Sequence, residues 1–286
     1  MRRLIVNADD LGADEARNRG IFDAIEAGTV TSVSVLANGH ALEDAKERWR
    51  RVGRTDVSLG IHINLSEGKP LTDNLHRLTG DDGFFRGKRA ALDLLDGEKS
   101  HELQDDIERE ISAQIGALRP FNTPITHLDG HQHVHVTANV LPIALAAAST
   151  NNICWIRIPD EPDPSIKSLI TEVTGQDEIA RFRRLGMAAR SHVMFSPINS
   201  PDHFRGLYLK GRLDINLLSD LLRDLPMGLT ELMVHPGRFA ETGPENPFAA
   251  FSTQDREKEL ETLLNPVFPV LLEKYGIRLI PFPEGL

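Results

Sequence analysis

The sequence predicts an α/β fold, a single-domain TIM-like (β/α) barrel of roughly seven to eight parallel strands over residues 1–286. Short apolar runs alternate with amphipathic helical segments along the whole chain, as expected for right-handed βαβ units. No internal repeat, low-complexity tract or linker divides the chain. A doubly wound open sheet is the structural alternative, because it is built from the same units.

Strands are predicted at short runs rich in Val, Ile and Leu, which are typical of buried parallel strands. In chain order these runs are Leu4–Val6, Val33–Leu36, Val57–Ile63, Ile125–Leu128, Trp155–Ile158, Val193–Phe195, Leu229–Val234 and Arg278–Ile280. Helices are predicted where apolar residues recur every three to four positions. These segments are Glu15–Ala27, Ala41–Val52, His101–Leu118, Thr137–Ser149, Ile215–Leu225 and Arg256–Lys274.

Three segments lack clear periodicity and are predicted as long loops: Ser66–Lys88, Ser196–Arg212 and Arg238–Thr253. Loops of this length inside a compact domain are usually functional. The first loop is rich in glycine and begins shortly after His62. We therefore expect it to border a pocket and to contribute to substrate choice.

The composition is that of a soluble globular protein, with 40% hydrophobic and 26% charged residues. The net charge of −10 argues against a nucleic-acid partner. The one cysteine, Cys154, excludes an internal disulfide and suits a reducing compartment. No apolar stretch is long enough for a signal sequence or a membrane span, so we expect a cytoplasmic protein. A homodimer is compatible with these properties.

Four of the eleven histidines lie within residues 127–135, together with Asp129. Imidazole is the commonest protein ligand for metals, so the cluster predicts a metal site, with a solvated polar turn as the alternative. Spacing alone does not choose the ligand. His131, His133 and His135 share a side if the segment is extended, and the first and last of them share a face if it is helical. Asp129 is a candidate for orienting a ligand histidine.

Unusual polar residues follow several of the predicted strands. In a parallel barrel the C-terminal ends of all strands meet at one face, where such folds place their active sites. Each residue alone has a structural interpretation, as a turn, a helix cap or an ion-pair partner. Their convergence predicts one site at the barrel mouth. The residues are Asp9, Asp10, His62, Asn64, the histidine cluster, Arg157 and His235.

These residue types suit a metal-assisted hydrolase of an amide or ester. One Asp and two His bind a divalent cation and leave positions open for water and substrate. A second Asp can act as general base, and a His on another strand can protonate the leaving group or stabilise the oxyanion. Arg157 is either a structural ion-pair partner or the group that keeps the base ionised. The chain has neither a phosphate-binding Gly-Lys-Ser/Thr loop nor a Gly-x-Ser-x-Gly elbow.

Four segments, in this order, resemble the YdjC-like carbohydrate deacetylase family, which is similar to NodB-type polysaccharide deacetylases. They are Ile5–Gly12 (IVNADDLG), Gly60–Pro70 (GIHINLSEGKP), Thr126–His135 (THLDGHQHVH) and His235–Gly237 (HPG). The resemblance implies a distorted (β/α) barrel that removes acetyl groups from N-acetylated sugars such as chitooligosaccharides. It also implies a divalent metal, usually Mg²⁺, although the same donor types accept Zn²⁺ or Mn²⁺. Leu11 stands where the family usually has Phe.

Carried onto this sequence, the resemblance implies that Asp10, His62 and His131 bind the metal. Asp9 becomes the catalytic base and His235 the acid, for which Asp129 is a candidate partner. Arg157 is a loose match to the arginine of the NodB pattern. Phe84 and Phe85 offer rings that either stack on a sugar or anchor their loop. The predicted substrate-binding or supporting residues are Arg157, Asp129, His133, Asn64, Phe84 and Phe85.

Two other functions compete with this prediction. Metal-dependent phosphoesterases and cyclic amidohydrolases on barrels also use His-x-His, but typically directly after the first strand, where this chain has two acids. A catalytically silent, metal-bearing sugar-binding protein would not need both Asp9 and His235 beside the metal.

Overall fold

The computed structural model describes residues 1–164, 175–240, 248 and 252–283. The strands are β1 (Arg2–Leu11), β2 (Ser32–Val35), β3 (Ser58–Ile63), β4 (Ile125–Gly130), β5 (Trp155–Ile156), β6 (His203–Arg205), β7 (Gly228–Val234) and β8 (Ile277–Leu279). They form one eight-stranded sheet in the order β5-β4-β3-β2-β1-β7-β6, with β8 beside β1. Every pairing between these strands is parallel.

The sheet curls toward closure as a barrel. β8 pairs with the first residues of β1 and β2 pairs with β1 from Asn7 onward, so both strands share one edge of β1. The outer strands approach each other through a parallel bridge between Trp155 in β5 and Asn199, which lies before β6. β1 to β5 follow one another in the sheet, without the mid-sheet switch of a doubly wound fold. The predicted distorted TIM-like barrel is confirmed.

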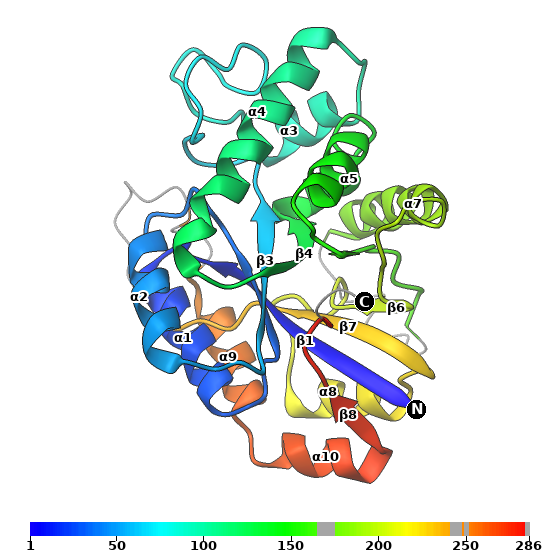
Figure 1. The fold of residues 1–286 in the computed structure, drawn as a ribbon. Coiled ribbons are helices and arrows are strands. Elements are labelled where there is room, and N and C mark those ends of the chain that lie inside the picture. Colours follow the sequence, from blue (N-terminus) through cyan, green and yellow to red (C-terminus); the bar gives the residue numbers. More distant parts are fainter. Residues whose placement is uncertain (165–174, 241–247, 249–251, 284–286) are drawn as a thin grey trace.

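Helices cover the outside of this sheet (Figure 1). They are α1 (Glu15–Glu26), α2 (Leu42–Val52), α3 (Lys88–Leu95), α4 (His101–Ala117), α5 (Leu141–Thr150), α7 (Gln176–Val193), α8 (Ile215–Arg223), α9 (Gln254–Leu263) and α10 (Val267–Tyr275), with the 3₁₀ segments η1 (Arg119–Phe121) and η2 (His131–Val136). α1 packs against α2 and α9, whereas α4 packs against α5 and β3. Asp14 caps the N-terminus of α1, because its side chain accepts a hydrogen bond from the Arg17 backbone amide.

The core explains why most strands are apolar runs. Leu4, Val33, Leu59 and Leu128 come from four neighbouring strands and are fully buried in one apolar cluster. β1 is buried along its whole length from Leu4 to its end, and this stretch includes polar residues. Burial of polar groups is costly unless they are paired, so the polar residues of β1 require partners inside the barrel.

One predicted strand is wrong. Val193 is the last residue of α7, and the next residues, Met194 and Phe195, are 74% and 90% exposed. The strand at this point in the order is β6, which lies inside the predicted loop Ser196–Arg212. β6 was missed because only one of its side chains, Phe204, is buried and apolar.

Other boundaries also differ from the predictions. The predicted helix Arg256–Lys274 is divided into α9 and α10, because Pro266 cannot continue the first helix. The loop Ser66–Lys88 contains only one isolated bridge, between Thr79 and Phe85, before α3 begins at its end. Much of the predicted loop Arg238–Thr253 lies outside the described residues. Among the helices that the structure describes, none is long and apolar enough to cross a membrane.

Candidate metal and catalytic site

Side chains from several strand ends line one small cavity at the barrel mouth. The cavity has a volume of about 50 Å³. Asp9 and Asp10 reach it from β1, His62 from β3, His131 from the start of η2, and His235 from the end of β7. The structure therefore brings together all five residues to which the resemblance gives a metal-binding or catalytic role.

A bulge near the end of β1 allows two consecutive aspartates to reach this cavity. Neighbouring side chains of a regular strand point to opposite faces. The register between β1 and β2 shifts between Ala8 and Leu11, so one extra residue is inserted in β1. Asp10 has a φ of 66°, in the left-handed region that non-glycine residues seldom adopt. This backbone conformation of Asp10 costs free energy that a regular strand would not, and strained conformations of this kind cluster at functional sites.

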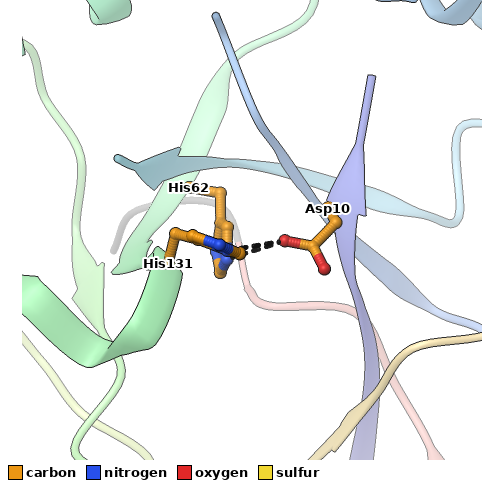
Figure 2. Close-up of side chains that lie close together, drawn as sticks. All are labelled: Asp10, His62 and His131. Carbon is orange, nitrogen blue, oxygen red and sulfur yellow. Dashed lines mark hydrogen bonds and ion pairs between the residues drawn. The ribbon is translucent and has the colours of Figure 1, made fainter. Parts of the chain in front are cut away.

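Asp10, His62 and His131 form a group of potential metal ligands. One donor atom of each residue lies within 4.8 Å of the other two, and all three residues are buried. Asp10 Oδ1 lies 3.3 Å from Nε2 of His62 and 2.9 Å from Nδ1 of His131. Figure 2 shows both rings pointing toward the Asp10 carboxylate. Two imidazoles and one carboxylate are a donor set that divalent cations accept, so these residues fit a metal ion.

The electrostatics of this group favour an ionised carboxylate beside charged imidazoles. Burial disfavours charge on Asp10, but His131 and His62 outweigh it and lower the pKa of that carboxyl well below its usual range. Burial likewise opposes charge on His62, yet Asp129 and Asp9 raise the pKa of that imidazole to about 10. The excess of buried acids would stabilise any cation at this position.

Arg157 lies beneath the cavity, fully buried, and binds three carboxylates. Its Nη1 and Nη2 each donate a 2.7 Å hydrogen bond to Asp9. Nη2 also lies 2.8 Å from Asp129, and Nε donates a 2.7 Å hydrogen bond to Glu231. A bidentate guanidinium pair is among the strongest contacts available to a buried carboxylate. Arg157 therefore fixes the orientation of Asp9 and places a positive charge beside it.

Asp9, His62 and Asp129 form a second group with metal-ligand spacing among the described residues. Here the Arg157 guanidinium already supplies the positive charge, because it contacts both carboxylates. His62 Nδ1 lies 2.7 Å from Asp129 Oδ1, which leaves Nε2 directed toward Asp10. The first group is thus the better candidate for a metal, and Asp129 orients one of its members.

His235 lies across the cavity from the β1 carboxylates. Its Nε2 is 3.8 Å from Asp9 Oδ2, and its Nδ1 is 3.9 Å from Glu259 Oε1. Glu259 also accepts a hydrogen bond from the His235 backbone amide. The expected pairing of Asp129 with His235 is therefore wrong, since Asp129 bonds His62 and Arg157. Burial, reinforced by the charge of Arg256, holds the pKa of His235 well below its usual value, so the ring is neutral.

The four clustered histidines have separate environments. His127 stacks on Phe282 with ring centroids 4.1 Å apart, and burial lowers its pKa to about 3. His135 Nε2 bonds the backbone carbonyl of Arg157 at 3.0 Å. His133 lines the cavity. The residue before it, Gln132, and His133 itself have φ values of 53° and 54°, which turn the chain so that only His131 meets Asp10.

The remaining predicted site residues lie further from the cavity. Asn64 is buried, and its side chain binds the backbone at Ser66 and Glu67. Phe85 belongs to the apolar core and Phe84 is 45% exposed, and neither lines the cavity. The structure therefore assigns these two rings no contact with the site, and the loop that carries them reaches the site only through its first residues.

Sequence reasoning missed several charged neighbours of the site. Arg17 Nη1 lies 3.1 Å from Asp10 Oδ2, and Glu67 Oε2 lies 2.7 Å from Nε2 of His131. Glu231 bonds Arg157, and burial raises the pKa of that carboxyl to about 7. Glu231 is the one charged residue in a mostly apolar strand run, LTELMV, so its charge was the available signal.

Comparison with known proteins identifies the family. The profile of the YdjC-like protein family matches residues 3–274. This chain belongs to the YdjC-like family. Its relatives include mouse and Geobacillus stearothermophilus proteins, both named carbohydrate deacetylase. The mouse protein is 33% identical, over 97% of this chain and 93% of its own length. The Geobacillus protein is 32% identical, over 99% and 98% respectively.

A solved protein from Enterococcus faecalis V583 has the same fold as this YdjC-like chain. The two superpose with a TM-score of 0.73 over 98% of this chain and 97% of the other, at 21% sequence identity. At that identity the likeness concerns the fold alone. The YdjC-like profile matches residues 3–274, and this region contains all the cavity-lining residues for which the sequence predicts a role, from Asp9 to His235.

Proposed function

We propose that this protein is a metal-dependent carbohydrate deacetylase, a hydrolase that removes acetyl groups from N-acetylated sugars. One observation carries the proposal. A complete set of metal donors, Asp10, His62 and His131, shares a buried cavity with an arginine-held carboxylate, Asp9, and a neutral imidazole, His235. The relatives named carbohydrate deacetylase support the substrate class.

We assign the binding of a divalent cation to Asp10, His62 and His131. Mg²⁺ is our first choice, and the mixed nitrogen and oxygen donors also suit Zn²⁺ or Mn²⁺. When bound, the cation would polarise the acetyl carbonyl and acidify a water molecule. Asp129 fixes His62 through Nδ1, so that Nε2 is the nitrogen available to the metal.

Asp9 is the proposed general base. In the reaction the water oxygen forms a bond to the acetyl carbon, and a water proton moves to the Asp9 carboxylate. Arg157 and the Asn7 amide, which donates a 2.8 Å hydrogen bond to Asp9 Oδ1, hold that carboxylate in place before the reaction. General-base catalysis of this kind contributes about 10²–10⁴-fold to a rate.

His235 is the proposed general acid. Breaking the C–N bond releases acetate and a sugar amine, and the amine nitrogen must gain a proton as it leaves. The neutral ring has Nε2 within 3.8 Å of Asp9, so the proton taken from water can return through His235 to the nitrogen. Glu259 Oε1 lies 3.9 Å from Nδ1 on the far side of the ring, and Glu259 also accepts a hydrogen bond from the His235 backbone amide.

The small volume of the cavity supports an acetyl substrate. A cavity of about 50 Å³ is well below the roughly 300–1,000 Å³ that encloses a drug-sized ligand. We infer that only the acetyl group enters it and that the sugar ring remains at the mouth.

The test is acetate release from a panel of N-acetylated monosaccharides and oligosaccharides. Metal-stripped protein is assayed alone and with Mg²⁺, Zn²⁺ or Mn²⁺, and a panel of sugar phosphates is assayed in parallel. We expect metal-dependent acetate release and no phosphate release. Phosphate release, or binding of N-acetylated sugars without any turnover, would contradict the proposal.

A further inference from the structure

In both candidate ligand histidines, the ring nitrogen that faces away from Asp10 contacts the carboxylate of another residue. His62 presents Nε2 to Asp10, and its Nδ1 lies 2.7 Å from Asp129 Oδ1. His131 presents Nδ1 to Asp10, and its Nε2 lies 2.7 Å from Glu67 Oε2. Each ring is therefore positioned by a carboxylate, His62 by Asp129 in β4 and His131 by Glu67 in the loop after β3.

Glu67 is fixed in place by its own backbone. Asn64, which is fully buried, accepts a 3.1 Å hydrogen bond from the Glu67 amide and donates a 2.7 Å hydrogen bond to the Glu67 carbonyl. Asn38 donates a second hydrogen bond to that carbonyl at 3.2 Å. The backbone amide of Asn64 in turn donates a 3.0 Å hydrogen bond to the side-chain oxygen of Gln114 in α4. Because both the N–H and the C=O of Glu67 are hydrogen-bonded, its backbone is fixed and its carboxylate is directed at His131, unlike the partner in a mobile surface ion pair.

We propose that Glu67 is a positioning residue of the metal site, which accepts the Nε2–H hydrogen bond of His131 and thereby presents Nδ1 to the cation. This inference rests on the proposed metal site and not on the deacetylation chemistry. Metal-binding histidines generally donate their second N–H to a carboxylate or carbonyl, which selects the tautomer and raises the basicity of the ligand nitrogen. Asp129 has this role for His62, and Glu67 supplies the matching partner for His131.

The test is a titration of the full-length chain with Mn²⁺ or Zn²⁺ by calorimetry, without substrate. Glu67→Ala is expected to weaken metal binding about 10–100-fold, the usual effect of removing such a partner. Glu67→Gln is expected to weaken it less, because the amide oxygen still accepts the hydrogen bond but carries no charge. Glu43→Ala and Glu43→Gln are the matched controls, since the Glu43 side chain is 86% exposed on α2 and pairs with Lys46 on the same helix.

The tautomer of His131 provides a second readout that a merely structural role would not change. Long-range ¹H–¹⁵N NMR of the metal-loaded wild type is expected to show the His131 proton on Nε2, and Glu67→Ala is expected to lose that preference. Unchanged metal affinity and an unchanged tautomer in Glu67→Ala would overturn the proposal. Absence of acetate release from the wild type, with the Glu67 effects intact, would count against the proposed function alone.

Discussion

At the scale of single residues, two neighbouring carboxylates in β1 have different partners, and the partners separate their roles. Asp9 is bound by Arg157 through two hydrogen bonds, so its charge is already compensated. Asp10 faces the nitrogens of His62 and His131. Asp10 also pairs with Arg17 through Oδ2, so the distinction rests on Asp10 Oδ1, which faces two imidazoles as a metal ligand would, whereas both oxygens of Asp9 bind one guanidinium.

We predict opposite outcomes for two adjacent substitutions. Asp9→Asn should lower the rate of acetate release about 10²–10⁴-fold and leave metal affinity near the wild-type value, because an amide keeps the shape but accepts no proton. Asp10→Asn should weaken metal binding. Metal affinity by calorimetry and initial rates check both variants. Loss of the metal in Asp9→Asn with retention in Asp10→Asn would reverse the two assignments.

Arg157 is predicted to be essential for stability as well as for orientation. Arg157→Met removes the guanidinium that bonds Asp9, Asp129 and Glu231 and leaves these carboxylates buried without it. The free energy of unfolding should fall by about 3–5 kcal/mol, as for other broken buried ion pairs. Urea denaturation measures this value. Arg181→Met, at a partly exposed arginine bonded to Asp93, is the control and should cost under about 1 kcal/mol.

The sequence could predict roles for the residues that lie in recognisable motifs. Asp9, Asp10, His62, His131 and His235 all lie in segments that resemble the family. The pairing of Arg157 with Asp9 joins residues 148 positions apart, so no local pattern reports it. The choice of His131 over its neighbours depends on left-handed backbone at Gln132 and His133, which neither residue type favours.

At the scale of secondary-structure elements, local irregularities direct the site residues toward the cavity. The bulge in β1 and the kink in η2 each place a side chain where a regular strand or helix would not. These irregularities are stabilised by the contacts that they make possible, such as the bond from His131 to Asp10. Sequence periodicity describes regular elements, so it predicted β1 and the cluster but not their shapes.

Glu161 joins two of these elements and predicts a pH effect on stability. It follows β5 and accepts hydrogen bonds from the amides of Gly206 and Leu207 after β6. Burial raises its pKa from 4.5 to about 7. Between these values the folded state binds more protons than the unfolded state, so stability should fall as pH rises through this window, by about 3 kcal/mol in total.

The Glu161→Gln variant isolates this contribution, because glutamine does not titrate. Urea denaturation from pH 4.5 to pH 8 should show the stability of the wild type falling relative to Glu161→Gln as pH rises. Glu43→Gln, at an exposed acid, should follow the wild type throughout. Parallel pH profiles for wild type and Glu161→Gln would contradict a raised pKa.

Helices and strands were predictable where burial gave them a clear period. β2, β3 and β7 were located within about two residues, since each contains branched apolar residues and is buried along nearly its whole length. α7 was missed, although Ile179, Phe182 and Ala189 recur on its buried face. Its last residue, Val193, is buried and begins the apolar run that predicts a strand, although Met194 and Phe195 are exposed; a short apolar run cannot by itself distinguish a strand from a helix end.

At the scale of the whole molecule, the barrel explains why distant segments form one site. Parallel strands bring their C-terminal ends to one face, so residues from β1, β3, η2 and β7 meet there although they span positions 9 to 235. This convergence was predictable from strand order alone. The distortion was not, because β8 pairs with the first residues of β1 on the edge that β2 occupies from Asn7 onward, and no local sequence pattern reports that shared edge.

The central claim is that Asp10, His62 and His131 bind a catalytic cation. The most direct measurement is a crystal structure of the full chain with Mn²⁺, in which anomalous scattering locates the ion. We predict one strong peak contacted by the Asp10 carboxylate, His62 Nε2 and His131 Nδ1, each at about 2.0–2.3 Å. No peak between these three side chains at saturating Mn²⁺, or a peak on Asp9 and Asp129 with Arg157 displaced, would contradict the claim.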